Sequence, residues 1–415
     1  MANIPSTATQ AQVSSEPIKV NYTPALISLA VLYFMMGFIT CLNDTLVPFF
    51  KKGFNLNYSQ SSLVQFYFFL TYGIMSIPAG KLVGRIGYKK GMVTGFGIAA
   101  IGAALFYPAA VVHQYYLFLA ALFVLAIGIV LLQVAANPYI TVLGPARTAS
   151  SRLTLIQGIG SVGTTVAPIF GAYFILGQIQ ESASSDAVKS PYLGISLLLI
   201  LIALAVLMLK LPVVSTSSDE QEKPADEPGS QQSALSFRNL RFGIAGIFFY
   251  VGAEVSIGTF LTNYIADLLK ISEEAANAYV AFYWGGMIVG RFMGSLLLNY
   301  IKASKVLVFC ALSAIAVIVL SLLTNGLVAS WAMISVGLFN SIMFAVIFSL
   351  SVNGLGKHTT QASGLLSTAI AGGAVISYSQ GLLIDHFSWK VAFALPIMCY
   401  LYIMFYGLSG YKIDK

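Results

Sequence analysis

Two acidic residues, Asp44 and Glu254, lie well inside apolar stretches of the sequence. Asp44 belongs to an apolar segment that ends at Lys51. Glu254 stands about thirteen residues from the nearest charged residue on either side, which at 1.5 Å per residue places it near the middle of a bilayer. A carboxylate at membrane depth costs roughly 2.5–3.5 kcal/mol, so it is retained where it faces a cavity or a pathway. Both residues are therefore candidates for binding an ion or a solute.

Each acid also has a purely structural interpretation. Asp44 lies about two helical turns, or roughly 10 Å, from Lys51, so it could be a helix-end carboxylate paired with that residue or with Lys52. Glu254 could be a protonated side chain that a neighbouring helix satisfies. We favour the functional interpretation, because among the 15 acidic residues these two lie well inside apolar spans.

Two kinds of ion chemistry are open to these acids. A desolvated carboxylate can carry a proton near neutral pH, and a carboxylate among hydroxyl and amide oxygens can hold a hard cation such as sodium. Asn43, Thr45 and Gln133 supply such oxygens beside Asp44 and Glu254. Gln133 cannot titrate, so it can orient an ion or a hydroxyl group but cannot move a proton. The sequence leaves open which acid couples and which binds the solute.

The composition excludes a soluble protein. Of the 415 residues, 58% are hydrophobic and 9% are charged, whereas soluble domains carry about a quarter charged residues. The net charge of +7 is not gathered into a basic run dense enough for nucleic acid. No HExxH, GxSxG or phosphate-loop motif occurs, and the 3 histidines lie at or beyond the ends of apolar segments. We therefore expect a membrane protein that is not an enzyme and has no cofactor or metal beyond a possible sodium ion.

The apolar windows are each long enough to span a bilayer as a helix. They predict an all-α integral membrane protein with twelve transmembrane helices in two pseudo-symmetric six-helix bundles. The predicted spans are residues 25–49, 62–84, 91–111, 115–143, 152–176, 190–210, 239–266, 275–298, 304–324, 329–352, 361–384 and 389–409.

The loops and tails indicate the orientation and the division of the chain. Most of the 22 basic residues lie in alternate loops or near the termini, which by the positive-inside rule puts both termini in the cytoplasm. Residues 213–237 are polar, acidic and rich in Pro and Ser, which is typical of a flexible linker. The predicted units are a disordered tail (1–24), an N-terminal bundle (25–211), a cytoplasmic linker (212–237), and a C-terminal bundle with a short tail (238–415).

The two predicted halves carry similar basic motifs. Residues 80–90 read GKLVGRIGYKK and include Arg85, and residues 290–294 read GRFMG and include Arg291. Small residues let helix ends approach closely, and an arginine there can bond to exposed carbonyl groups. We interpret the two sites as repeated gating loops, although two ordinary basic loops would also give this pattern.

On these motifs the sequence resembles the major facilitator superfamily, because GKLVGRIGYKK is similar to the family signature G-x-x-x-D-R-x-G-R-[RK]. Gly84 stands where the signature has Asp. Within the superfamily the chain resembles the fucose:proton symporter family, whose members move fucose, glucose, galactose, mannose or N-acetylglucosamine. The segments that carry this resemblance are GFITCLNDTLVPFFKKGF (37–54), AANPYITVLGP (135–145), FFYVGAEVSIGTFL (248–261) and GRFMGSLLL (290–298).

The resemblance carries over residue by residue. Asp44 matches the first-helix Asp that the fucose transporter uses in binding and coupling, and Gln157 matches a retained Gln. Gln133 stands where the fucose transporter has Glu, Gly160 where it has a sugar-binding Asn, and Glu254 where it has a neutral Gln. Relative to the fucose transporter, one acid is thus lost at position 133 and one is gained at position 254. This pattern is more similar to the glucose/galactose branch of the family, where sodium coupling is also known.

Other polar and aromatic residues in the predicted spans could contact a sugar. Gln133 and Asn137 are one turn apart and share a helix face. The remaining candidates are Gln157, Asn263, Tyr283, Trp284, Asn340 and Gln380. A lone buried amide is more often a link between helices than a ligand, so for Asn263, Asn340 and Gln380 both interpretations stay open.

The sequence therefore predicts a secondary transporter that imports a neutral, glucose- or galactose-like hexose by sodium or proton symport through alternating access. An uncoupled sugar uniporter and a transporter-fold sugar sensor remain alternatives. The expected partners are a small-molecule sugar and membrane lipid, with no nucleic acid. We expect a monomer with many membrane passes in a bacterial inner membrane.

Overall fold

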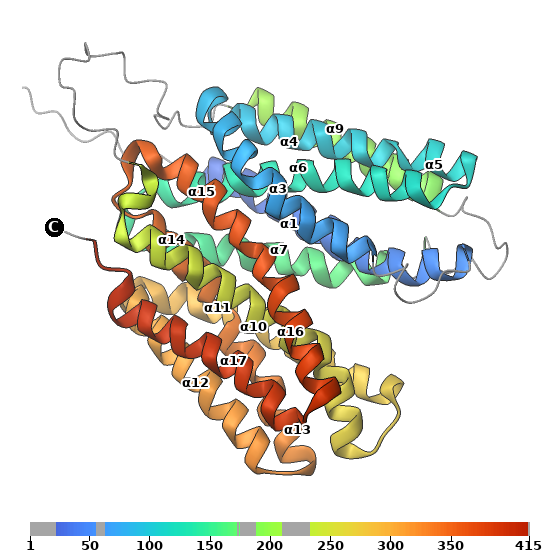
Figure 1. Ribbon diagram of the computed structural model, residues 1–415. Coiled ribbons are helices and arrows are strands. Elements are labelled where there is room, and N and C mark those ends of the chain that lie inside the picture. Colours follow the sequence, from blue (N-terminus) through green and yellow to red (C-terminus); the bar gives the residue numbers. More distant parts are fainter. Residues whose placement is uncertain (1–21, 55–62, 172–173, 175–187, 210–232, 414–415) are drawn as a thin grey trace, which may run out of the picture.

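A computed structural model describes residues 22–54, 63–171, 174, 188–209 and 233–413. Its helices fall into two groups that follow the chain order (Figure 1). The first group contains α1 (Thr23–Gly53), α3 (Leu63–Ile86), α4 (Tyr88–Ala104), α5 (Phe106–Val112), α6 (Tyr115–Val142), α7 (Ala149–Gly171) and α9 (Lys189–Met208). The second contains α10 (Arg238–Leu269), α11 (Glu273–Tyr300), α12 (Ala303–Leu323), α13 (Gly326–Asn340), α14 (Met343–Val352), α15 (Thr359–Thr368), α16 (Gly372–His386) and α17 (Trp389–Phe405).

These helices match the twelve predicted spans. Ten segments of the described chain are long and apolar enough to cross a membrane. The other two crossings are α3 and α7, with 24 and 23 residues. Three spans are interrupted, because α4 and α5, α13 and α14, and α15 and α16 each form one crossing. The predicted all-α membrane fold is confirmed. The predicted tail and linker lie largely outside the described residues, and their boundaries stay predictions.

Within the first half, α1 and α7 pack with their backbones in close contact. A Cβ atom added at Gly163 would overlap the carbonyl oxygen of Phe34, and one added at Gly37 would overlap that of Gly160. Only residues without a side chain allow two membrane helices to approach this closely. Gly160 and Gly163 therefore serve static packing inside one half, whereas Gly364 packs across the two halves against Gly80.

The two halves meet at one end of the molecule, which we call the basic face. Here α3, α6, α11 and α14 end, α4, α7, α12 and α15 begin, and the side chains include Lys89, Arg147, Lys302 and Lys357. Hydrogen bonds across this end include Ser150 Oγ to Ser349 Oγ (2.6 Å), Ser151 Oγ to Ser295 O (2.6 Å), Ser363 Oγ to Val134 O (3.0 Å), Thr360 Oγ1 to Tyr88 Oη (3.2 Å) and Arg147 Nη2 to Asn299 O (3.4 Å).

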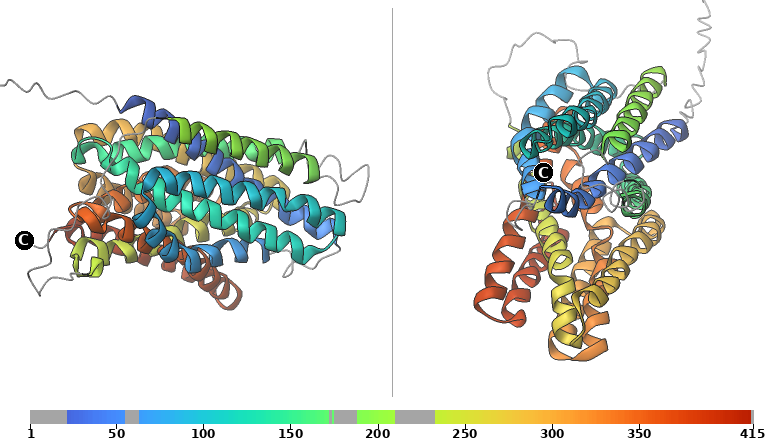
Figure 2. Two further views of the ribbon diagram at one scale, coloured as in Figure 1. Left: turned by 90° about the horizontal axis from the view of Figure 1, so that it is seen from above. Right: turned by 90° about the vertical axis from the view of Figure 1, so that its right-hand side faces the viewer.

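Toward the opposite end the ribbons of the two halves diverge, as Figures 1 and 2 show. The C-terminus lies at the end where they meet. The halves are thus held together at the basic face, mostly by serine and threonine hydroxyl groups. Such bonds contribute little individually, on average about 0.6 kcal/mol between membrane helices.

The close packing of α1 on α7 gives a stability prediction. We expect Gly163→Ala to destabilise the protein by about 1–3 kcal/mol, because the new methyl group forces two packed backbones apart. Gly97→Ala in α4 is the matched control, since nothing lies within 4 Å of a Cβ atom at that position. The melting temperature of the purified protein in detergent should fall for Gly163→Ala alone. Equal melting temperatures for the two variants would contradict this account of the packing.

Candidate functional site

Glu254 lies at the middle of α10, so its carboxylate is near mid-membrane. Tyr250 precedes it by one helical turn, lies on the same helix face and is buried. The guanidinium group of Arg291, on α11, is close enough to interact electrostatically with Glu254. An opposite charge nearby reduces the cost of keeping a carboxylate at this depth.

Arg291 also joins the two halves. Its Nε atom donates to the carbonyl oxygen of Ser341 (3.2 Å), between α13 and α14, and its Nη1 atom donates to the Oγ atom of Ser161 on α7. The Arg291 side chain therefore forms hydrogen bonds with both halves and interacts electrostatically with Glu254. A change of charge at Glu254 therefore alters the electrostatic environment of a side chain that contacts both halves.

The interpretation of Arg291 as part of a gating loop is wrong in position. Arg291 lies inside α11, nine residues before its end at Tyr300. The helix continues because the residues after Arg291 are apolar enough to remain in the membrane, so the GRFMG motif does not mark a helix end. Arg85 does lie in the last turn of α3 and is exposed. Its gating role stays a prediction.

Asn340 belongs to a buried network of hydrogen bonds among four helices, α10, α11, α13 and α17. Its Nδ2 atom donates to the hydroxyl of Tyr283 (3.0 Å), and its Oδ1 atom accepts from the hydroxyl of Tyr400 (2.7 Å). The Tyr283 hydroxyl in turn donates to the backbone carbonyl oxygen of Glu254 (3.3 Å). Both ends of the Asn340 amide are used, which favours a link between helices over a ligand. The network also fixes the backbone of α10 at Glu254.

Two predicted glutamines have buried polar atoms without a partner among the described residues. Gln380 of α16 is completely buried, and neither its Nε2 nor its Oε1 atom makes a hydrogen bond. Gln133 of α6 is half-buried, and its Oε1 atom is buried without a partner. Each such group costs about 1–3 kcal/mol unless something else bonds to it.

The other predicted residues are placed less centrally. Asn137 of α6 is buried, and its Oδ1 atom accepts a hydrogen bond from the hydroxyl of Tyr33 on α1. Gln157 of α7 is half-buried. Trp284 of α11 is 46% exposed and lies against Gly258 of α10. Asn263, on α10, is exposed.

The predicted cation ligands of α1 are only partly described. Asn43, Asp44 and Thr45 lie within the helix, about two to three turns before its end at Gly53. Their side chains are outside the described residues. The assignment of a cation site to these three residues therefore stays a prediction.

Sequence reasoning missed four residues of this region: Tyr250, Tyr33, Tyr400 and Ser161. Tyr250 had a usable signal, because it stands four residues before Glu254 and hence on the same helix face. Tyr33, Tyr400 and Ser161 had none, since their roles depend on which helices become neighbours.

The molecule is thus a two-bundle membrane protein with an acid, an arginine and unpaired amides in its spans, which is the arrangement of a secondary transporter. The family model of the major facilitator superfamily matches residues 29–378. The chain belongs to this superfamily and is a transporter, not an enzyme.

Relatives and solved structures agree. The chain is 51% identical over 397 residues to a glucose/galactose transporter of Brucella abortus, covering 94% of this chain and 95% of that protein. It is 31% identical over 401 residues to the L-fucose-proton symporter of Escherichia coli, covering 91% of each. A crystal structure of the transporter FucP in the outward conformation superposes with a TM-score of 0.85 at 31% identity, covering 94% of this chain and 99% of that one.

The Asn340 network generates a second prediction. We expect Tyr283→Phe to lower the stability by about 1–3 kcal/mol, because it removes the acceptor of the Asn340 amide and a donor to the Glu254 carbonyl. Tyr378→Phe is the control, since that side chain is 72% exposed and should tolerate the change. Thermal unfolding in detergent measures both. A Tyr283→Phe protein as stable as the control would show that the network does not support α10.

Proposed function

We propose that the protein imports a neutral, glucose- or galactose-like hexose by symport with sodium or protons. The observations that carry this proposal are the position of Glu254 at the middle of α10 and the hydrogen bond that Arg291, which interacts electrostatically with Glu254, donates to Ser161 of the other half. Binding of a cation or a proton at Glu254 changes the charge that Arg291 faces. The hydrogen bond between the halves then responds to occupancy of the site, as coupling in an alternating-access cycle requires.

The unpaired polar groups support a polyhydroxylated solute. Gln133 and Gln380 together offer a donor and acceptors with no partner among the described residues. Hydroxyl groups of a sugar can use these atoms, and the partly exposed ring of Trp284 offers an apolar wall for the sugar's C–H face. The names of the relatives, a glucose/galactose transporter and an L-fucose-proton symporter, point to the same class of solute.

The charge asymmetry supports one orientation of the molecule in the membrane. The positive-inside rule assigns the basic face to the cytoplasm of a bacterial inner membrane. The halves are joined at that face, so the described state is closed toward the cytoplasm. Import then requires the hydroxyl-mediated bonds at the basic face to break after sugar and cation have bound. In this proposal a single copy of the chain completes the cycle.

Ion coupling is tested by hexose uptake into proteoliposomes, first with an inward sodium gradient at equal pH and then with an inward proton gradient without sodium. We expect one gradient to drive accumulation, and Glu254→Gln, Asp44→Asn or both to reduce it at least tenfold, since neither amide can carry the charge of a carboxylate. Asp385→Asn removes an exposed carboxylate and should keep full accumulation. Uptake that equilibrates without accumulation under both gradients would identify a uniporter and refute the symport proposal.

The role of Gln380 is tested by Gln380→Leu. We expect the sugar-free melting temperature to stay the same or rise, because a buried unpaired amide is removed. Hexose affinity, measured by isothermal titration, should fall about 10- to 100-fold if the amide bonds to sugar, each tenfold step corresponding to about 1.4 kcal/mol. Gln114→Leu makes the same change at an exposed position. A lower melting temperature with unchanged affinity would mean that Gln380 only links helices.

A further inference from the structure

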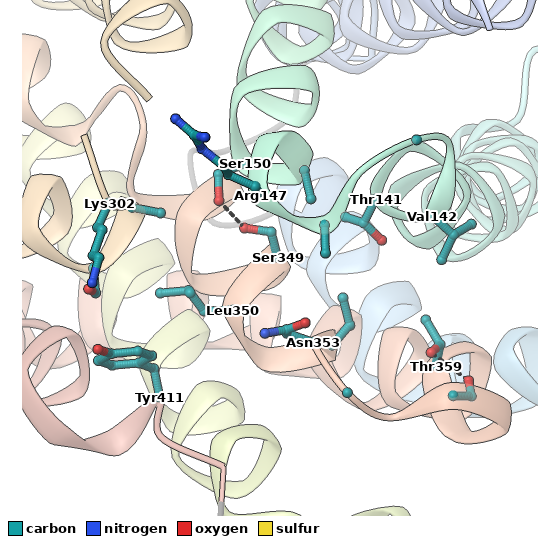
Figure 3. Close-up of a pocket in the computed structure, with 18 of the residues that line it drawn as sticks. Thr141, Val142, Arg147, Ser150, Lys302, Ser349, Leu350, Asn353, Thr359 and Tyr411 are labelled. Carbon is teal, nitrogen blue, oxygen red and sulfur yellow. Dashed lines mark hydrogen bonds between the residues drawn. The ribbon is translucent and has the colours of Figure 1, made fainter. Parts of the chain in front are cut away.

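A cavity of about 790 Å³ lies between the two halves at the basic face. The ends of α6 and α7 line it from the first half, and the ends of α12, α14, α15 and the C-terminal segment line it from the second half. Figure 3 shows Lys302 and Tyr411 on one side of the cavity, Thr141 and Thr359 on the other, and the hydrogen bond from Ser150 to Ser349 between them. This volume is typical of a site for a small organic ligand. The cavity is separate from the mid-membrane site around Glu254.

The lining of the cavity is cationic. Arg147, Lys302 and Lys357 line it, and no acidic residue is among the lining side chains of the described chain. Arg147 is exposed. Its Nη2 atom donates to the carbonyl oxygen of Asn299, and its other N–H groups can donate to a ligand. The side-chain amide of the exposed Asn353 adds a neutral donor. Cations held around one cavity repel each other unless an anion lies among them, and arginine and lysine together are suited to phosphate.

The cations come from both halves. Arg147 belongs to the first half, and Lys302 and Lys357 belong to the second. An anion bound among them adds charge-assisted bonds across the interface that Ser150 and Ser349 already join. Such a ligand binds the closed basic face more tightly than a face whose halves have separated, so it shifts the population toward the closed state.

We propose that this cavity is a regulatory site for a phosphate-bearing anion, and that its occupancy holds the basic face closed and slows transport. The cavity is much larger than inorganic phosphate, so the ligand carries its phosphate on a further group. A soluble organic phosphate and a phospholipid headgroup share this chemistry. The site does not depend on which hexose or cation the protein carries.

Binding is tested with sodium pyrophosphate on the purified full-length protein in an uncharged detergent, against sodium chloride of equal ionic strength. We expect a saturable rise in melting temperature with pyrophosphate alone. The apparent dissociation constant should rise at least tenfold in Lys302→Gln/Lys357→Gln. The matched control, Lys90→Gln/Lys305→Gln, removes two exposed charges from the same face outside the cavity and should bind as the natural sequence does. No rise with pyrophosphate, or equal weakening in the two double variants, would overturn the site.

An experiment in nanodiscs distinguishes a lipid headgroup from a soluble phosphate as the ligand. Stabilisation by phosphatidylglycerol over phosphatidylcholine that Lys302→Gln/Lys357→Gln abolishes would identify a lipid headgroup. Stabilisation by pyrophosphate in phosphatidylcholine alone would identify a soluble phosphate.

The effect on transport is tested by entrapping pyrophosphate at the basic face in proteoliposomes. Hexose uptake should slow several-fold for the natural sequence and for Lys90→Gln/Lys305→Gln, and not for Lys302→Gln/Lys357→Gln. Binding without any slowing would refute the regulatory part of the proposal. Loss of uptake in every protein without pyrophosphate would instead contradict the proposed hexose transport and leave the binding result standing.

Discussion

The structure depends on how it keeps charge inside a membrane. A carboxylate at mid-depth is costly, and Glu254 is retained beside the guanidinium group of Arg291. Arg291 is itself secured by the Ser341 carbonyl oxygen and by Ser161. Arg291 therefore links the electrostatic environment of Glu254 to a contact between the two halves.

The backbone of α10 is fixed at the point where this charge lies. Tyr283 donates to the carbonyl oxygen of Glu254, and Asn340 links Tyr283 to Tyr400 on α17. These three side chains are fully buried, so their bonds have no competition from water. Close packing at glycine adds to this in both halves, between α1 and α7 through Gly163 and between α10 and α16 through Gly372. The hydrogen bonds between the halves mostly involve single hydroxyl groups.

The fold could be predicted from the sequence almost completely, because each crossing is a long apolar segment and the bilayer sets its length. Glu254 could be found for the same reason, as a charge in the middle of such a segment. The predicted span 275–298 also contained Arg291, but the contacts of its side chain with Ser341 and Ser161 could not be predicted, since they depend on which helices become neighbours. The sequence predicts both Asn340 and Gln380 to be amides inside helices. Only the packing shows that Asn340 forms hydrogen bonds and that Gln380 forms none with the described residues. Hydrogen-bond partners depend on neighbours that periodicity does not specify.

Hydroxyl hydrogen bonds between the halves and glycine packing within them respond differently when helices move apart. A transporter must break one interface in every cycle without unfolding either half, so that interface has to be weaker than the packing inside each half. Hydroxyl bonds of about 0.6 kcal/mol each meet this requirement, and four such bonds between the halves can be broken for the few kcal/mol that separate two populated states. Backbone contact through glycine, as between α1 and α7, has no such intermediate state, because a small separation already loses the close packing. The chain thus places hydroxyl-mediated bonds where the halves must separate and glycines where helices must stay together. Close packing at glycine also crosses the moving interface, at Gly80 against Gly364 and at Gly373 against Phe69.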